Sequence, residues 1–159
     1  MKSITIGTLV LLAAACTPQA PQQSTPQAPP APSKEVIASQ DAPAAIGPYS
    51  QAIKIGDTVW LAGQISLDPV TGGLITGNIE IETRQVMANI EAVLAASGMS
   101  LSNVVQTQVY LADLNDYQKF NEVYAEYFPN NPPARAVVQV SRLPRDAKVE
   151  IMMTAHRAQ

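Results

Sequence analysis

The chain has very few of the residues that build metal sites and covalent cross-links. Its 159 residues include one cysteine, Cys16, and one histidine, His156. A structural zinc site takes about four cysteine or histidine ligands, and a disulfide takes a pair of cysteines. The sequence therefore excludes a disulfide framework within the chain, and we expect no metal site.

Basic side chains are also scarce, and the sequence contains no run of lysine or arginine. The 10 Lys and Arg residues are outnumbered by 13 Asp and Glu residues, which gives a formal net charge of -3 at pH 7. A nucleic-acid-binding domain normally carries its basic residues as a patch or stripe. We therefore expect no nucleic-acid partner.

The first 15 residues have the pattern of a secretory signal peptide. Lys2 supplies a short positive start, and Ile4–Ala15 is a run of apolar or small residues. A membrane-spanning helix needs about 20 such residues, so the run is too short to cross a bilayer. It leads into the segment 12–16, Leu-Ala-Ala-Ala-Cys, which resembles a bacterial lipobox with Ala13 where leucine is usual. We expect cleavage before Cys16 and lipidation of its thiol, and an ordinary signal peptide that leaves a free thiol is the alternative.

Residues 16–33 predict a tether between that anchor and a folded domain. After the cysteine they are mainly proline, glutamine, alanine, serine and threonine, a composition that favours extended chain over a packed core. Thr17, and not aspartate, follows the cysteine, which suggests the outer membrane in a Gram-negative cell. We therefore expect an exported lipoprotein of the cell envelope, facing the periplasm, with a membrane-tethered domain at residues 34–159.

Strand signals occur in six segments of that domain. Each is rich in β-branched or aromatic residues, and turn residues such as Gly56 and Asp57 separate them. The expected strands are Glu35–Ser39, Gln51–Ile55, Thr58–Gln64, Val104–Ala112, Arg135–Arg142 and Lys148–His156. The second and third segments predict a hairpin, because a two-residue turn joins them.

Two helices are expected between the strands. Apolar residues recur at helical spacing over Ile79–Ser97, and Gly98 stands where a left-handed cap belongs. A second helix is expected over Asp116–Tyr127, capped by Asp113 or Asn115. The order β-β-β-α-β-α-β-β predicts an α+β domain with both helices on one face of a sheet. The other face then needs a cover, so we expect an oligomer.

Four segments together resemble the signatures of the RidA (YjgF-type) family, in order and in spacing. They are Ala42–Gln51, Ala62–Ile65, Pro133–Ala136 and Arg142–Ile151. The resemblance implies a chorismate-mutase-like mixed sheet with two helices on one face, assembled as a homotrimer with active sites in the clefts between subunits. It also implies hydrolysis of reactive 2-imino and 2-enamino acids to 2-oxo acids and ammonia, without a metal or an organic cofactor.

Arg135 is the first candidate site residue. Strand alternation places Arg135 and Val137 on one face and Ala136 and Val138 on the other. We expect the apolar set to face the helices and Arg135 to point to the opposite face. A buried guanidinium needs a partner, and its fork matches a substrate carboxylate, which is the role that the resemblance implies for Arg135. A structural salt bridge is the alternative, with Glu150 as one candidate partner.

The remaining candidates take their roles from the resemblance. Glu150 would position the attacking water, although a solvated carboxylate on an edge strand is the alternative. Tyr49 would line the cleft, and Gly63 would let the backbone approach the ligand closely. Asn121 would lie near the pocket, unless it is simply an exposed helix residue.

The sequence departs from the family pattern at two positions of the expected substrate site. Ala62 stands where many members carry serine, and Val137 stands where many carry cysteine. A lost hydroxyl removes one hydrogen bond, on the order of 1 kcal/mol. Imino-acid deamination is the leading hypothesis. A non-catalytic binding module for small carboxylates or amino acids is the second, and a purely structural or partner-binding lipoprotein is the third.

Overall fold

Six strands and two α-helices follow one another in the expected order. The computed structural model describes residues 33–158. The strands are β1 (Lys34–Ile37), β2 (Ala52–Ile55), β3 (Thr58–Leu61), β4 (Val104–Leu111), β5 (Ala134–Gln139) and β6 (Val149–His156), and the helices are α1 (Ile79–Ala96) and α2 (Tyr117–Tyr127). The predicted signal peptide, lipidation site and nearly all of the tether fall on residues 1–32, outside this described part. No helix within it is long and apolar enough to span a membrane.

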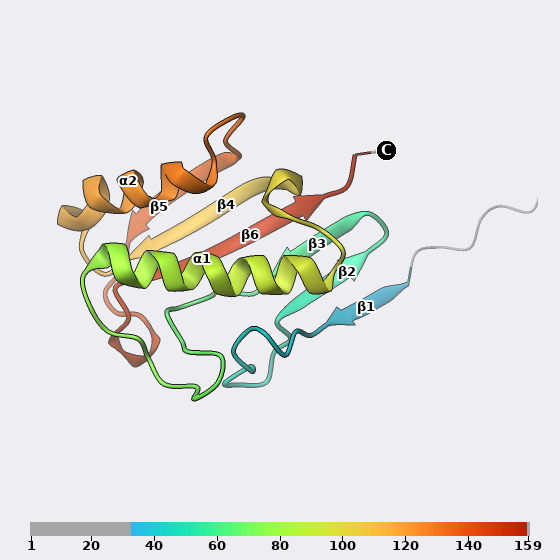
Figure 1. Cartoon of the computed structure of the whole chain (residues 1–159), viewed down its shortest axis with the longest axis horizontal. Helices are drawn as coiled ribbons and strands as arrows, with labels where there is room; N and C mark the ends of the chain where they lie inside the picture. The colour runs from blue at the N-terminus through green and yellow to red at the C-terminus, as the bar shows by residue number, and fades with distance from the viewer. Residues whose placement is uncertain (1–32, 159) are drawn as a thin grey trace, which may run out of the picture. The chain divides into compact units, whose positions relative to one another are not determined.

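The strands form one mixed sheet in the order β1-β2-β3-β6-β4-β5. Only the β4–β5 pair is parallel, and α2 makes the crossover between these two strands. The other neighbours in the sheet pair antiparallel. Both helices lie on the same side of the sheet (Figure 1). The predicted α+β class, the mixed sheet and the placement of both helices on one face are therefore confirmed.

Local sequence features explain where the main elements begin and end. Gly56 has a positive φ of 56° at the β2–β3 turn, as the predicted hairpin requires. The side chain of Asn78 accepts a hydrogen bond from the Ile81 amide at the start of α1. At its other end Gly98, at φ 73°, donates its amide to Ala95 and closes the helix as expected.

The second helix begins slightly later than expected. The side chain of Asp113 accepts from the amide of Asn115 and caps a short 3-10 turn, Leu114–Asp116, so that α2 starts at Tyr117. All six strands are shorter than expected, and β3 and β5 differ most from their expected ranges. β3 ends at Leu61 because the chain leaves the sheet and returns for a single bridge between Gln64 and Ile151. β5 runs from Ala134 to Gln139, so it begins one residue before its expected range and ends three residues before the expected end at Arg142.

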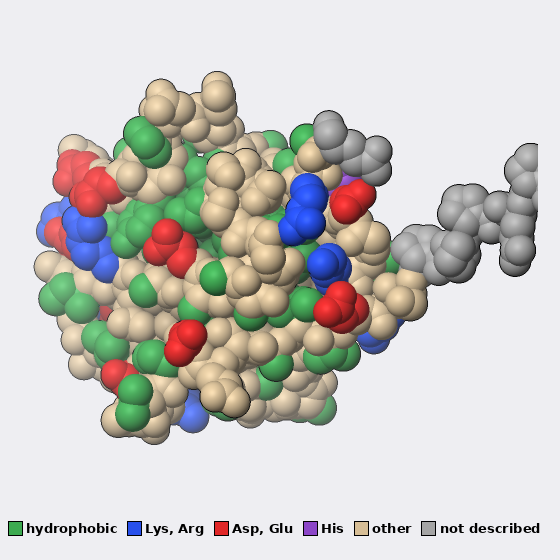
Figure 2. Space-filling view, turned by 45° about the vertical axis from the view of Figure 1, so that its right-hand side comes forward, with side chains coloured by type: hydrophobic (Ala, Val, Ile, Leu, Met, Phe, Trp, Pro, Cys, Tyr) green, Lys and Arg blue, Asp and Glu red, His purple; other side chains and the backbone are tan. Residues whose placement is uncertain are grey.

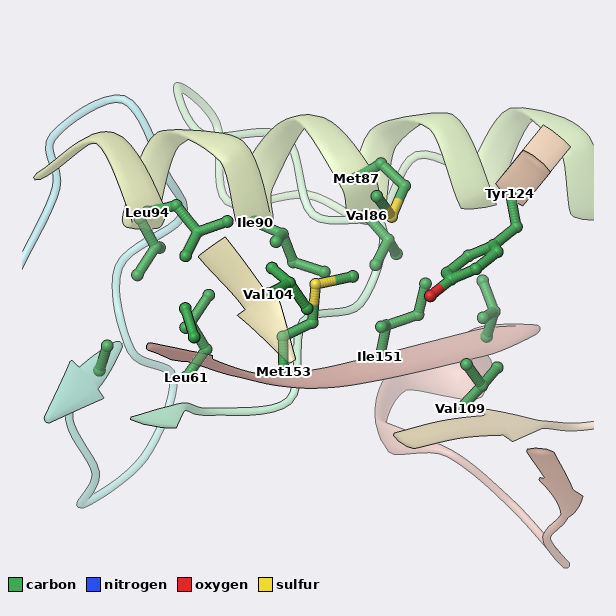
Figure 3. Packing of buried hydrophobic residues seen from close by; sticks show 14 of the residues in the cluster. Leu61, Val86, Met87, Ile90, Leu94, Val104, Val109, Tyr124, Ile151 and Met153 are labelled. Atoms are coloured by element: carbon green, nitrogen blue, oxygen red, sulfur yellow. The ribbon is translucent and has the colours of Figure 1, made fainter. Parts of the chain in front are cut away.

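The core fills the space between the helix layer and the sheet. Val86, Ile90 and Leu94 on α1 point down toward Ile151 and Met153 on β6 (Figure 3). All five are at most 2% exposed. Full burial of one such side chain contributes roughly 1.5–3 kcal/mol. The helical spacing seen in the sequence therefore marks the buried face of α1.

The opposite face of the sheet has no helix over it among residues 33–158. The strand register lines up Ile53, Trp60 and Thr154 across β2, β3 and β6, and Tyr110 with Val138 across β4 and β5. Trp60 and Val138 are each 46% exposed. A single protomer thus leaves large apolar side chains of its central sheet in contact with water. Exposed apolar patches of this kind are typical of protein–protein interfaces.

Candidate active site

A cleft of about 240 Å³ opens where the segment before β2 meets the end of β3 and the start of β6. Its wall is mainly apolar, with Pro43, Ala44, Ile46, Ala62, Gly63, Ile65, Leu67 and Pro144, and its polar side chains are Tyr49, Gln51, Gln64 and Glu150. Three of the expected site residues, Tyr49, Gly63 and Glu150, therefore lie together in one cleft. An apolar cleft with a few convergent polar groups is the usual form of a small-molecule site.

Glu150 and Gly63 are in direct contact in this cleft. The backbones of Gln64 and Ile151 exchange two hydrogen bonds, of 2.9 and 3.0 Å, which lay the Gly63 segment along β6. A Cβ added at Gly63 would overlap a carboxylate oxygen of Glu150 and lie 2.8 Å from its Cδ. Any residue other than glycine would displace the carboxylate. The close approach expected at Gly63 is therefore made by its backbone to the Glu150 side chain.

Glu150 is half-buried, and burial raises the pKa of its carboxyl above the usual 4.5. Among residues 33–158 the carboxylate has no hydrogen-bond or ion-pair partner. The other polar side chains of the cleft are engaged. The Tyr49 hydroxyl accepts from the Ile46 amide at 3.2 Å, and the Gln64 amide donates to the Ala62 carbonyl at 3.3 Å. Glu150 is thus the acidic side chain of the cleft that lacks a partner in this part of the chain, and it can act on a ligand or a water molecule. The Tyr49 hydroxyl accepts one bond and still has its own O–H to donate.

Gln51 builds the wall of the cleft from within. Its side-chain carbonyl accepts from the Ser39 amide at 2.6 Å, and its amide nitrogen donates to the carbonyls of Ser39, Ala42 and Pro43. These bonds satisfy backbone groups of an irregular segment that would otherwise be buried unpaired. Gln51 belongs to the same motif as Tyr49, but sequence reasoning did not assign it a role.

Helix α1 holds the other wall. The amide of Asn89 donates to the carbonyls of Ile65 and Leu67 at 3.2 and 2.9 Å. The buried carboxylate of Glu82 accepts from the Ser66 hydroxyl at 3.2 Å and from the Lys148 amide at 2.8 Å. Both the 65–67 segment and the start of β6 are fixed to α1 in this way. The polar residues on the inner edge of α1 were missed because a helical pattern marks only its apolar positions.

Arg135 points to the helix side of the sheet, and the expected orientation was wrong. Its partner in the register is Thr107, which is in turn opposite Met153 in the core. The alternation along β5 was read correctly, but the faces were exchanged. We expected the apolar set to face the helices, whereas Val138 lies on the uncovered face and is exposed. The reason is that α2 offers aromatic rings, and these accept a guanidinium.

The surroundings of Arg135 on α2 are specific. Its Nη2 donates to Oδ1 of Asn121 at 2.7 Å, so the expected proximity of these residues is present in the structure. The guanidinium carbon lies 4.6 Å from the ring centroid of Tyr124 and 5.6 Å from that of Phe120. The Tyr124 hydroxyl donates to Thr107 at 3.0 Å and fixes its ring. Arg135 is therefore held on one side and leaves other N–H groups available.

Arg135 and Glu150 do not meet within one chain. Glu150 is opposite Tyr110, which is opposite Val138, so the carboxylate belongs to the uncovered face, whereas Arg135 belongs to the helix face. The alternative of a salt bridge between Arg135 and Glu150 is excluded for the described chain by this arrangement. The two candidates line different hollows at different places on the surface.

Val137 lies beside Arg135 and forms part of its hollow. Leu114, Tyr117, Arg135 and Val137 line an open depression of about 430 Å³. Arg135 also lines a second depression, of about 460 Å³, together with Asn121 and Tyr124. Tyr117 was not among the expected site residues, because its place at the end of a turn carries no signal in the sequence. No cluster of three or more metal-ligating side chains occurs among residues 33–158.

Comparisons with known proteins point to one family. The family model described as Endoribonuclease L-PSP matches residues 39–157. A RutC family protein of Pyrococcus horikoshii is 54% identical over 124 residues, which are 78% of this chain and 98% of that protein. The 2-iminobutanoate/2-iminopropanoate deaminase of Mus musculus is 47% identical over 118 residues, 74% of this chain and 87% of that protein. The structure of E. coli TdcF with bound serine matches with a TM-score of 0.75 at 38% identity, covering 78% of this chain and 99% of that one.

Proposed function

This chain belongs to the RidA/YjgF (Ribonuc_L-PSP) family, and on that premise we propose that its domain hydrolyses reactive 2-imino and 2-enamino acids to 2-oxo acids and ammonia. The observation that carries the proposal is the Glu150 carboxylate, which is half-buried in an apolar cleft and has no partner among residues 33–158. Curated relatives in mouse and human are named as 2-iminobutanoate/2-iminopropanoate deaminases, which supports this reaction.

Glu150 acts as the general base and then as the general acid. As a carboxylate it takes a proton from a water molecule while the water oxygen attacks the carbon of the protonated imine. The product of this step is a carbinolamine. Glu150 then returns the proton to the nitrogen. As the C–N bond breaks, the hydroxyl proton of the carbinolamine passes to the ionised Glu150 and from there to the departing ammonia, so that ammonium and the 2-oxo acid leave and Glu150 is a carboxylate again. The raised pKa of Glu150 brings the carboxyl closer to the operating pH, which favours these proton transfers.

Arg135 binds the substrate carboxylate, and it does so from a neighbouring subunit. The two residues lie on opposite faces of one sheet, so a single protomer cannot bring both to one small substrate. A homotrimer that covers the uncovered sheet faces, with Trp60 and Val138 at the contact, would place Arg135 of one protomer against the Glu150 cleft of the next. The exposed apolar side chains of that face support this assembly.

Subunit mixing tests this arrangement directly. Arg135→Ala and Glu150→Gln are each expected to abolish most of the activity. If each site takes its arginine and its glutamate from different subunits, exchange between the two variants creates one competent cleft in every mixed trimer. Activity then reappears on mixing. A site within one subunit gives no recovery, and sedimentation equilibrium that shows a monomer at micromolar concentration contradicts the assembly.

The reaction itself is tested by ammonia release. Freshly generated 2-iminobutanoate is supplied to the purified domain 34–159, and the rate is compared with spontaneous hydrolysis and with the Glu150→Gln variant. We expect acceleration with the wild type only. Because free imines already hydrolyse in water, positioning of the reactants is a sufficient source of the acceleration.

A binding module without catalysis is the second candidate. E. coli TdcF was solved with bound serine, so a relative of this chain holds an amino acid. The same Arg135 would hold a carboxylate in either case. If the wild-type protein binds 2-oxobutanoate but never exceeds the spontaneous rate of imine hydrolysis, the domain is a binding module and not a deaminase.

RNA is not favoured as a substrate despite the description of the family model. The chain carries a net charge of -3. On the face shown in Figure 2, blue and red side chains lie next to one another and form no basic stripe. Binding to a phosphate backbone depends on clustered lysine and arginine. We therefore keep small carboxylic acids as the substrate class.

Export and lipidation remain part of the proposal on the strength of residues 1–33. We propose that Cys16 becomes the acylated N-terminus and tethers the domain in the cell envelope, at the periplasmic side of the outer membrane in a Gram-negative cell. Multiple acyl chains make such anchoring stable. Intact-mass measurement should find cleavage before Cys16 and added lipid, and Cys16→Ser should remove the protein from the membrane fraction. Cleavage elsewhere with a free thiol would refute lipidation.

A further inference from the structure

Tyr117 lies in the hollow of Arg135 without a role in the reaction described so far. It is the first residue of α2, one helical turn before Asn121, and it lines the depression of about 430 Å³ together with Leu114, Arg135 and Val137. Its side chain is 41% exposed, so the hydroxyl is not committed to the core. The Tyr117 phenol and the Arg135 guanidinium therefore line the same depression.

The phenol is coupled to the carboxylate-binding arginine. A hydrogen bond with the Asn121 side chain, the positive charge of Arg135 and a hydrogen bond with the Arg135 guanidinium lower the pKa of Tyr117 below its usual value of 10.0. Asn121 also accepts the 2.7 Å hydrogen bond from Arg135, so Tyr117, Asn121 and Arg135 form one connected group. Among residues 33–158, Arg135 is the charged residue that shifts the pKa of the Tyr117 phenol. The other residues that line the hollow, Leu114 and Val137, are apolar.

A carboxylate in this hollow has more acceptor positions than the arginine can fill. Each of its two oxygens accepts more than one hydrogen bond, and Arg135 already directs N–H groups to Asn121 and to the Tyr117 oxygen. A further donor beside the guanidinium is therefore needed to satisfy the anion. The Tyr117 hydroxyl is the O–H group that lines the same hollow.

We propose that Tyr117 is a further substrate-contacting residue, whose hydroxyl donates a hydrogen bond to the carboxylate held by Arg135. This inference rests on the proposed function, in which Arg135 binds that carboxylate. Together the two residues recognise the carboxylate by a charged fork and a neutral donor. Imines that lack a carboxylate next to the C=N carbon make neither contact.

The contact has a characteristic dependence on pH. Only the protonated phenol donates, and the phenolate repels the substrate carboxylate. Affinity for a carboxylate ligand should therefore fall as the pH rises through the pKa of Tyr117, which lies below the ordinary tyrosine value. Conversely, a bound carboxylate favours the protonated phenol and shifts its ultraviolet phenolate titration to higher pH.

The experiment uses the full chain, with 2-oxobutanoate as the carboxylate probe and 2-iminobutanoate as the substrate. Tyr117→Phe keeps the ring at a partly exposed position, so the fold persists. We expect roughly tenfold weaker binding of the probe, in line with the loss of one hydrogen bond to a charged group. KM should rise by a similar factor, kcat should change little, and the alkaline decline in affinity should disappear. Tyr127→Phe, a tyrosine of the same helix outside the hollow, is the matched control and should leave probe affinity, KM, kcat and the alkaline decline as they are in the wild type.

The outcomes separate this inference from the proposed function. If Tyr117→Phe binds 2-oxobutanoate like the wild type and keeps the alkaline decline, the inference is overturned while the deaminase proposal stands. If the wild type neither binds 2-oxobutanoate nor accelerates imine hydrolysis, both fall together. A change in kcat alone, with KM and affinity unaltered, also overturns the proposed contact.

Discussion

Gly63→Ala is a sharp test of the catalytic role of Glu150, because it adds a single methyl group against the carboxylate. The new Cβ would overlap one carboxylate oxygen and lie 2.8 and 3.0 Å from Cδ and Cγ of Glu150. Gly63 does not have a positive φ, so alanine is compatible with the backbone. The strain is therefore relieved by rotation of the flexible glutamate side chain, and the carboxylate leaves its present position.

The effects on stability and on catalysis should differ in size. A side-chain torsion displaced by about 30° from its preferred rotamer costs roughly 0.5–1.5 kcal/mol, which sets the expected loss in the free energy of unfolding. By contrast, a misplacement of about 1 Å in a catalytic group can reduce the rate by roughly a hundredfold. We expect kcat for 2-iminobutanoate to fall by about that factor, while the protein remains folded and still binds 2-oxobutanoate.

Ammonia release and thermal unfolding measure the two effects on the same preparation. Gly73→Ala is the matched control, because its added Cβ would meet only the Thr71 hydroxyl, at 3.3 Å, in an exposed loop. In the double variant with Glu150→Gln, the alanine should cost little further activity, since both changes act on one group. A Gly63→Ala enzyme with wild-type kcat would refute the reasoning, and so would fully additive effects in the double variant.

Three more outcomes follow from the same geometry. Arg135→Lys should weaken 2-oxobutanoate binding about tenfold or more in a calorimetric titration, because a point charge cannot replace the guanidinium fork. Glu150→Gln should be more stable than the wild type at neutral pH, because burial raises the pKa of the Glu150 carboxyl in the folded state. The carboxyl therefore contributes stability below its ordinary pKa of 4.5, and this contribution is lost as the pH rises through the folded-state pKa. Denaturant unfolding should show that the difference in the free energy of unfolding between variant and wild type shrinks toward acid pH. Ala62→Ser should restore a hydroxyl to the cleft and raise kcat/KM about fivefold, the equivalent of one hydrogen bond, and an unchanged value would mean that the hydroxyl is not used.

Much of the fold could be predicted from the sequence because local signals and tertiary packing agree. The α1 pattern, with Ile90 and Leu94 on one stripe, coincides with the buried face of the helix. Gly56 and Gly98 adopt the positive φ values that their turn and cap require. Boundaries were less accurate where tertiary contacts decide them, as at the end of β3, where the bridge between Gln64 and Ile151 replaces continued strand pairing.

The site could be predicted only in part, because periodicity gives the alternation of faces but not which face is covered. Arg135 and Val137 were correctly grouped, yet their side of the sheet depends on the aromatic rings of Phe120 and Tyr124. Those rings come from a different element, and the pattern of β5 carries no information about them. Gln51 was missed for a related reason, since its hydrogen bonds to the 39–43 segment exist only once the chain has folded back on itself.

The division of the site between two faces links substrate binding to assembly. In the proposed trimer, Glu150 and Arg135 reach one substrate only across a subunit boundary, so the substrate carboxylate and its reacting carbon are held by different chains. A ligand that binds only the assembled form stabilises that form by RT ln(1 + [L]/Kd). At a ligand concentration about a hundredfold above Kd, this amounts to about 2.7 kcal/mol. With the 2-oxo acid product bound, the trimer should therefore resist dissociation on dilution. An isolated protomer should bind the ligand more weakly, because Arg135 and Glu150 of one chain cannot both contact it.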